Sequence, residues 1–145
     1  MSIVTLEQAD RIADAVMKVG RQRNAQPLTV AVLDTGGHVV VMKRADGSGI
    51  MRCEIAHGKA WGALGMGLPS RTLFERTPKQ PGFFAALGPV SGGRMVPVPG
   101  GVLLRDSDGT LIGAVGASGD TSDIDEECIV EAIKAFGLVA DTGQN

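Results

Sequence analysis

The sequence predicts a mixed α/β (α+β) fold in which helices cover an antiparallel β-sheet. Apolar residues recur at helical spacing near both ends of the chain and in its middle, and two pairs of short apolar runs are each joined by a turn. Consecutive hairpins build an antiparallel sheet, and amphipathic helices bury their apolar sides against it. No Gly-x-Gly-x-x-Gly stands between a strand and a helix, so we expect no nucleotide cofactor.

Length and composition predict one domain over residues 1–145. The 145 residues are 43% hydrophobic, which is enough for a real core. The net charge is −2, no lysine- or arginine-rich block occurs, and only 3% of residues are aromatic. Nucleic acid and anionic membrane surfaces are therefore not expected partners.

The sequence lacks the features of export and membrane insertion. The first residues show no basic region followed by an apolar run, and no apolar run approaches the ~18 residues of a membrane span. Cys53 and Cys128 are too few for a disulfide framework and have no metal-ligand spacing. We expect a cytoplasmic protein with both thiols reduced and buried.

The first half of the chain predicts a helix and then a hairpin. Thr5 and Gln8 fit a capping box, and apolar residues repeat every three or four positions up to Gly20. The runs 28–33 and 39–42 flank an Asp-Thr-Gly-Gly turn. This pattern predicts two antiparallel strands.

A central helix is predicted from Arg52 to about Pro69. Its two sides differ, because Glu54 and His57 share one face with a tryptophan, while Arg52 and Lys59 lie on the opposite face. Three glycines weaken this helix by about 1 kcal/mol each relative to alanine. We therefore expect a neighbouring backbone, a ligand or a subunit to approach the helix closely.

The next segments change from regular to irregular. Ser70 is expected to cap a short helix that reaches Arg76. Residues 77–101 are rich in proline and glycine and predict a long packed loop, with a possible short strand over 95–98. A loop of this length inside a compact domain is usually functional or disordered.

The last third predicts a second hairpin and a final helix. Runs at 102–104 and 111–115 flank an Asp-Ser-Asp-Gly turn. The acidic residues 125–127 lie in the first turn of a helix that continues to Val139. The helix dipole favours negative charge at this end, so we interpret these residues as a helix start rather than as a calcium-binding loop. The tail over 141–145 is expected to fray.

Several motifs, taken in order along the chain, resemble those of the haem-binding and glycolate-operon accessory family (DUF336-like). This family includes an extracellular haem-binding sensor partner and the carboxyl-terminal domain of certain corrinoid adenosyltransferases. The matching segments are 32–40, 43–47, Ala56-x-x-Lys59-Ala60, Pro69-Ser70, Gly92-Gly93, 99–102 and 112–119.

The resemblance implies a profilin-like three-layer α/β/α domain with an antiparallel sheet of about five strands. It also implies dimers or larger homo-oligomers and, in some members, haem bound through a histidine. The first predicted helix here contains no histidine. The resemblance therefore leaves His38 or His57 as the iron ligand.

Glu54 and His57 stand three residues apart on the central helix, close enough for the carboxylate to orient the imidazole and raise its pKa. The pair suits a general acid and base, or a metal-ligating histidine with a supporting carboxylate. A solvated pair without a role explains the spacing as well. His38, at the tip of the first hairpin, is expected to be exposed.

Cations and glycines suggest a small anionic ligand. Two arginines and a lysine could bind one carboxylate or a haem propionate. Equally, their aliphatic stems could lie over the sheet while their charged ends reach solvent. Paired glycines permit positive φ and close approach of a ligand, or serve only in turns. These candidate ligand-binding residues are Arg44, Arg52, Lys59, Gly92, Gly93, Gly100 and Gly101.

The first hypothesis is a small oligomeric ligand-binding protein that takes haem or a similar anionic ligand. The alternative is an enzyme of small-carboxylate or aromatic ring-fission catabolism, acting as an isomerase, hydratase or hydrolase. In that enzyme His57 and Glu54 would move protons, while Arg52 and Lys59 would bind the substrate carboxylate. A third hypothesis is an oligomeric accessory subunit.

Overall fold

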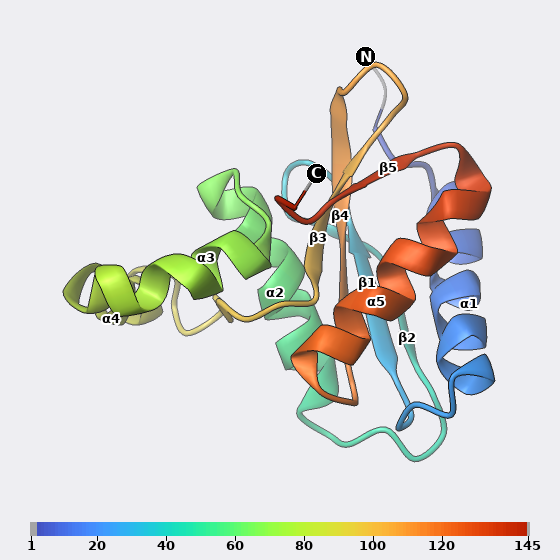
Figure 1. The fold of residues 1–145 in the computed structure, drawn as a ribbon, viewed down its shortest axis with the longest axis horizontal. Coiled ribbons are helices and arrows are strands. Elements are labelled where there is room, and N and C mark those ends of the chain that lie inside the picture. The colour runs from blue at the N-terminus through green and yellow to red at the C-terminus, as the bar shows by residue number, and fades with distance from the viewer. Residues whose placement is uncertain (1–2, 145) are drawn as a thin grey trace.

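A computed structural model describes residues 3–144 of the chain (Figure 1). The elements follow one another as helix, hairpin, helices, hairpin, helix and short strand. In order they are α1 (Leu6–Gln22), β1 (Thr29–Leu33), β2 (Val39–Arg44), α2 (Arg52–Met66), α3 (Ser70–Arg76), the 3₁₀ turn Thr77–Lys79, α4 (Pro81–Val90), β3 (Gly101–Arg105), β4 (Leu111–Ser118), α5 (Ser122–Ile133), the 3₁₀ turn Lys134–Phe136 and β5 (Val139–Asp141).

The strands form one antiparallel sheet in the order β2-β1-β4-β3-β5. Helices α1 and α5 cover one face of the sheet, and α2 covers the other (Figure 1). The mixed α/β fold, both hairpins and the sheet of five strands are therefore confirmed. The capping box at the start of α1 is also confirmed, since Thr5 and Gln8 exchange hydrogen bonds.

The two faces of the sheet bury side chains of different size. Valine, isoleucine and leucine fill the side under α1 and α5, whereas the side under α2 is lined mainly by alanines, with Leu33 and Leu103. Small side chains let α2 lie very close to the strands. At Gly101 and Gly116, a Cβ atom would overlap the carbonyl groups of Lys59 and Ala56. This close approach between α2 and the sheet uses glycines of the strands, not those of the helix.

The prediction of one irregular loop over 77–101 is wrong. Residues Pro81–Val90 form α4, and proline fits its first turn because the missing N–H would have no helical acceptor there. Most of α4 is exposed, and Phe84 is its buried residue. Within residues 3–144, the segment 95–98 forms no strand.

Two other element boundaries differ from the prediction. Helix α5 ends at Ile133 rather than Val139, and β5 then pairs with β3 instead of leaving a frayed end. Ser70 does not cap α3, because its hydroxyl oxygen instead accepts a hydrogen bond from the Gly101 N–H at 2.7 Å. Strand β5 and Ser70 are thus positioned by contacts with residues distant in the sequence, which a local sequence pattern does not predict.

A buried ion pair joins α2 to α5. The Lys59 ammonium donates to the Asp125 carboxylate at 3.1 Å and to the Ala117 carbonyl at 2.9 Å. The Lys59 and Asp125 side chains are 2% and 0% exposed. Burial lowers the pKa of Lys59 and raises the pKa of Asp125, and each partner's charge opposes the shift of the other.

The acidic residues at the start of α5 therefore do more than favour the helix start. Asp125 pairs with Lys59, and Glu126 accepts a hydrogen bond from Arg71 of α3 at 3.0 Å. Both carboxylates tie α5 to elements on the opposite side of the sheet. Across residues 3–144, no helix is long and apolar enough to span a bilayer.

Lys59→Met should destabilise the fold by about 3–5 kcal/mol, because it leaves the Asp125 carboxylate buried without its partner. Lys43→Met is the matched control, since Lys43 pairs with Asp10 and Asp14 at the surface and should cost about 1 kcal/mol or less. Urea unfolding measures both changes. Equal losses in the two variants would contradict a structural role for the buried pair.

Candidate functional site

A hollow of about 510 Å³ lies between α2 and the segment 92–96, and we call it the α2 pocket. Helix α2, strand β2 and the glycine turn after α4 all contribute to its walls. Its lining residues are Met42, Met51, Cys53, Glu54, Ile55, His57, Gly92, Gly93, Arg94 and Val96.

Two glycines of α2 form the contact surface for this segment. At Gly58 a Cβ atom would overlap the Arg94 carbonyl, and at Gly62 it would lie 2.9 Å from the Met95 Cγ. The Val96 N–H donates to the Gly58 carbonyl at 3.2 Å. The segment is therefore fixed against the helix by main-chain contact rather than hanging over it.

His57 is partly buried in the α2 pocket. Desolvation, and then the positive charge of Arg94, lower the pKa of its imidazole below the ordinary 6.5. The expectation that Glu54 raises this pKa is therefore wrong. Among residues 3–144, the hydrogen bonds and ion pairs include none between Glu54 and His57. The lowered pKa favours the neutral imidazole, which is the form that ligates metals.

Arg94 is the charged residue of the pocket that sequence reasoning overlooked. Its guanidinium carbon lies 4.1 Å from the centre of the Trp61 ring, and its Nε donates to the Ser91 carbonyl at 3.0 Å. Stacking on an aromatic face suits a guanidinium and leaves its edge available for an anion. A signal existed in the sequence, because Arg94 is the only charged residue between Lys79 and Arg105 and follows two glycines.

Sulfur and aliphatic side chains complete the lining. Met42 and Met51 bring thioethers, and the partly exposed Cys53 brings a thiol one helical turn from His57. Thioethers adapt to irregular apolar ligands. The α2 pocket thus combines the imidazole of His57, the carboxylate of Glu54, the guanidinium of Arg94 and a mainly apolar wall.

The structure brings four of the predicted site residues together in the α2 pocket, namely Glu54, His57, Gly92 and Gly93. The glycines have φ of 66° and 78°, which only glycine adopts easily, so they form the turn that aims Arg94 at the helix.

Lys59 and Arg52 lie elsewhere. The Lys59 ammonium makes its hydrogen bonds inside the fold, and Arg52 donates to the Ser118 hydroxyl at 3.0 Å. Gly100 and Gly101 pack against Lys59 rather than lining the pocket. Their ligand-binding role stays a prediction that these contacts do not favour.

His38 and Arg44 are also outside the α2 pocket. The His38 side chain is 80% exposed at the hairpin turn, with its Nδ1 3.2 Å from an Asp34 oxygen. Arg44 lines a different hollow and donates to the Ser48 carbonyl at 3.0 Å. In the described part of the chain, His, Cys, Asp and Glu form no group of three that could hold a metal ion by themselves.

A comparison with known protein families shows which family the chain belongs to. Residues 4–134 match the family model described as haem-degrading protein HbpS-like. The chain belongs to the HbpS-like family. A 15.0 kDa protein encoded in the dhaT-dhaS intergenic region of Citrobacter freundii is 28% identical over 136 residues, which is 94% of each chain.

Solved structures of the same fold support this assignment. The PduOC complex with haem has a TM-score of 0.84 and 26% identity, and the match covers 96% of this chain and 99% of that one. HbpS matches with a TM-score of 0.81 and 26% identity over 94% and 92% of the chains. The Klebsiella pneumoniae protein ORFY, of family DUF336, has a TM-score of 0.81 and 27% identity over 93% of both chains.

Gly58→Ala should displace the segment 94–96 and destabilise the protein by about 1–3 kcal/mol through overpacking. Gly65→Ala, on the same helix with no atom within 4 Å of the added methyl, should stabilise it by up to about 1 kcal/mol. Thermal unfolding gives both values, and tryptophan fluorescence reports movement at Trp61. A stabilised Gly58→Ala variant would contradict the close contact.

Proposed function

We propose that this chain binds haem in the α2 pocket with His57 as the iron ligand. The observation that carries the proposal is the position of His57, partly buried in an apolar hollow with its pKa lowered. Membership of the HbpS-like family and the likeness to the PduOC complex with haem support the choice of ligand.

The residues of the pocket fit the chemistry of haem. A neutral imidazole is a common iron ligand in haem proteins. The porphyrin is a flat apolar ring, and Met42, Met51, Ile55 and Val96 offer it an apolar wall. A volume of about 510 Å³ lies within the range of ligand pockets. Bound haem would supply an iron centre that can change its oxidation state.

Arg94 has the charge that haem propionates require. Its guanidinium is held by the Ser91 carbonyl and by the Trp61 ring, so little side-chain freedom is lost when it binds an anion. Its positive charge also disfavours a proton on His57. Arg94 thus assists iron ligation through the imidazole and binds the charged edge of the ligand.

The enzyme alternative has less support. It needs Arg52 and Lys59 to bind a substrate carboxylate beside Glu54 and His57, but Lys59 is paired with Asp125 inside the fold. Neither Arg52 nor Lys59 lines the α2 pocket. Haem binding requires none of these contacts.

We also propose that the chain forms homo-oligomers through the arm made by α3 and α4. This arm extends away from the sheet (Figure 1). Its exposed apolar side chains include Phe74 at 49%, Phe83 at 50% and Val90 at 79%. Exposed apolar surface of this kind favours association. A monomeric mass in sedimentation at high protein concentration would refute the proposed oligomer.

The cytoplasmic location of the protein stays a prediction.

Titration of the purified chain with haemin, followed by its Soret absorbance, tests the proposal. The parent should saturate near one haem per chain. His57→Ala should shift the band and weaken binding by at least about tenfold, because the iron loses its protein ligand. His38→Ala is the matched control and should behave like the parent. Unchanged binding and spectrum in His57→Ala would refute the proposal, provided that circular dichroism shows both variants folded.

The pH dependence of haem affinity should reflect the pKa of His57. Protons compete with iron for the imidazole, so affinity should stay constant as pH falls to about 6.5 and decline only below it. Arg94→Gln removes a positive charge, which should raise the His57 pKa and move this decline to higher pH.

The control for Arg94→Gln is Arg76→Gln, which removes an exposed charge from α3 outside the pocket. It should leave the midpoint of the pH profile unchanged. Identical profiles for parent and Arg94→Gln would contradict the coupling between Arg94 and His57.

A further inference from the structure

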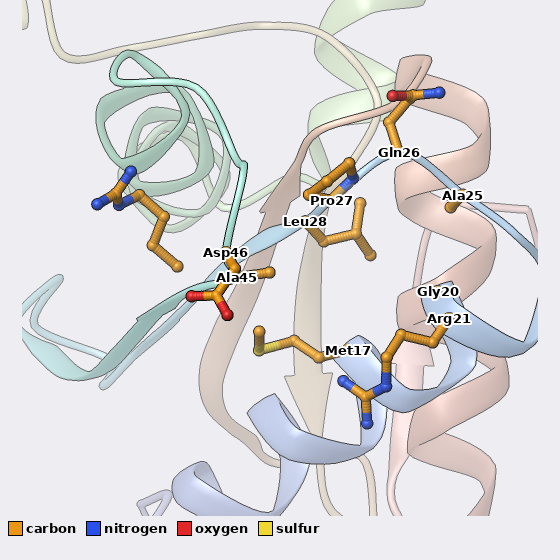
Figure 2. Close-up of a pocket in the computed structure, with 10 residues that line it drawn as sticks. Met17, Gly20, Arg21, Ala25, Gln26, Pro27, Leu28, Ala45 and Asp46 are labelled. Atoms are coloured by element: carbon orange, nitrogen blue, oxygen red, sulfur yellow. The ribbon is translucent and has the colours of Figure 1, made fainter.

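A second hollow, of about 480 Å³, lies between the end of α1 and the end of β2, and we call it the α1 groove (Figure 2). It shares no lining residue with the α2 pocket. The lining comes from three segments, which are 17–21 of α1, 25–28 before β1, and 44–46 at the end of β2.

The walls of the α1 groove are fixed by main-chain hydrogen bonds. The Ala45 N–H donates to the Leu28 carbonyl at 3.0 Å, and the Ala25 N–H donates to the Gly20 carbonyl at 2.9 Å. The Gln26 N–H donates to an Asp120 carboxylate oxygen at 2.8 Å. Three elements are thereby joined around the hollow, so its shape exists before any ligand arrives.

The floor of the groove is apolar. Leu28 is 3% exposed, and Met17 is partly buried on the helix beside it. Figure 2 shows the Met17 thioether between Arg21 on one side and Asp46 on the other, with Leu28 and Pro27 above it in the view. An aliphatic side chain of a ligand would find contact surface here.

Arg21 and Asp46 carry opposite charges on opposite walls, and they form no ion pair with one another or with any other residue of 3–144. Their neighbours differ in this respect. Arg23 pairs with Glu127 and Glu131, and Lys43 pairs with two aspartates. Within residues 3–144, Arg21 and Asp46 thus face the groove without an ion-pair partner.

We propose that the α1 groove is a second binding site, which takes a small zwitterion with an apolar side chain, such as an aliphatic α-amino acid. The ligand carboxylate pairs with the Arg21 guanidinium, and the ligand ammonium pairs with the Asp46 carboxylate. The aliphatic side chain lies on Met17 and Leu28. This site goes beyond the proposed haem site and does not depend on it.

The charges of the groove favour a zwitterion over a ligand that carries a single charge. A carboxylate without an ammonium group leaves Asp46 facing an anion, and an amine without a carboxylate leaves Arg21 facing a cation. Arg44 adds a second guanidinium to the rim, but it already donates to the Ser48 carbonyl. Both exposed contacts are individually weak, so binding requires the two together with the apolar floor.

Backbone amide NMR of the ¹⁵N-labelled chain titrated with L-leucine tests the proposal. Leucine should shift the amide signals of Ala25, Ala45 and Asp46 in a saturable way. N-acetyl-leucine lacks the ammonium and leucine amide lacks the carboxylate, so each should bind at least about threefold more weakly. 2-Hydroxy-4-methylpentanoate replaces the ammonium by a hydroxyl and should also bind more weakly than leucine.

Two variants separate the two charges. Asp46→Asn should weaken leucine binding but not N-acetyl-leucine binding, and Arg21→Gln should weaken leucine binding but not leucine amide binding. Lys18→Gln, an exposed cation of α1 outside the groove, and His57→Ala should keep the parent affinity for leucine. The proposal is overturned if leucine shifts none of these amides, or if its affinity is the same in Arg21→Gln, Asp46→Asn and the parent.

Discussion

The whole structure depends on how closely the backbone of α2 approaches its neighbours on two sides. On one side, Gly101 and Gly116 let the helix rest directly on β3 and β4. On another side, Gly58 and Gly62 receive the segment that carries Arg94. Any side chain at Gly58, Gly101 or Gly116 would overlap a main-chain atom. Glycine is poor at stabilising a helix on its own, so α2 owes its stability to these contacts.

This packing determines which polar groups of α2 are structural and which face solvent. Lys59 points toward the sheet, where it has Asp125 and the Ala117 carbonyl as partners. His57 lines the α2 pocket, where the charge of Arg94 lowers its pKa. Residues two positions apart on one helix thus have different roles, because the sheet covers one of them and the glycine-rich turn leaves the other accessible.

The sequence predicted the elements that a local pattern defines. The capping box at Thr5, both hairpins and the start of α2 at Arg52 needed only periodicity and turn residues. Helix α4 was missed because its prolines and glycines are typical of loops, although Pro81 stands where a helix tolerates it. Strand β5 has only three residues and depends on its pairing with β3. Its own short sequence does not predict this pairing.

The site was predicted in part for similar reasons. Helical spacing placed Glu54 with His57 and glycine chemistry singled out Gly92 and Gly93, and all four line the α2 pocket. Spacing alone could not tell which face of α2 the sheet would cover, so Lys59 was assigned to a ligand although it is 2% exposed. Arg94 reaches the pocket through tertiary contact with Trp61, which depends on how the chain folds back after α4.

A crystal structure of the chain with bound haem tests the central claim most directly. We expect iron bonded to the imidazole of His57, with the porphyrin between the start of α2 and the segment 92–96 and a propionate on Arg94. Iron bonded at His38, or haem located away from the α2 pocket, would contradict haem binding through His57.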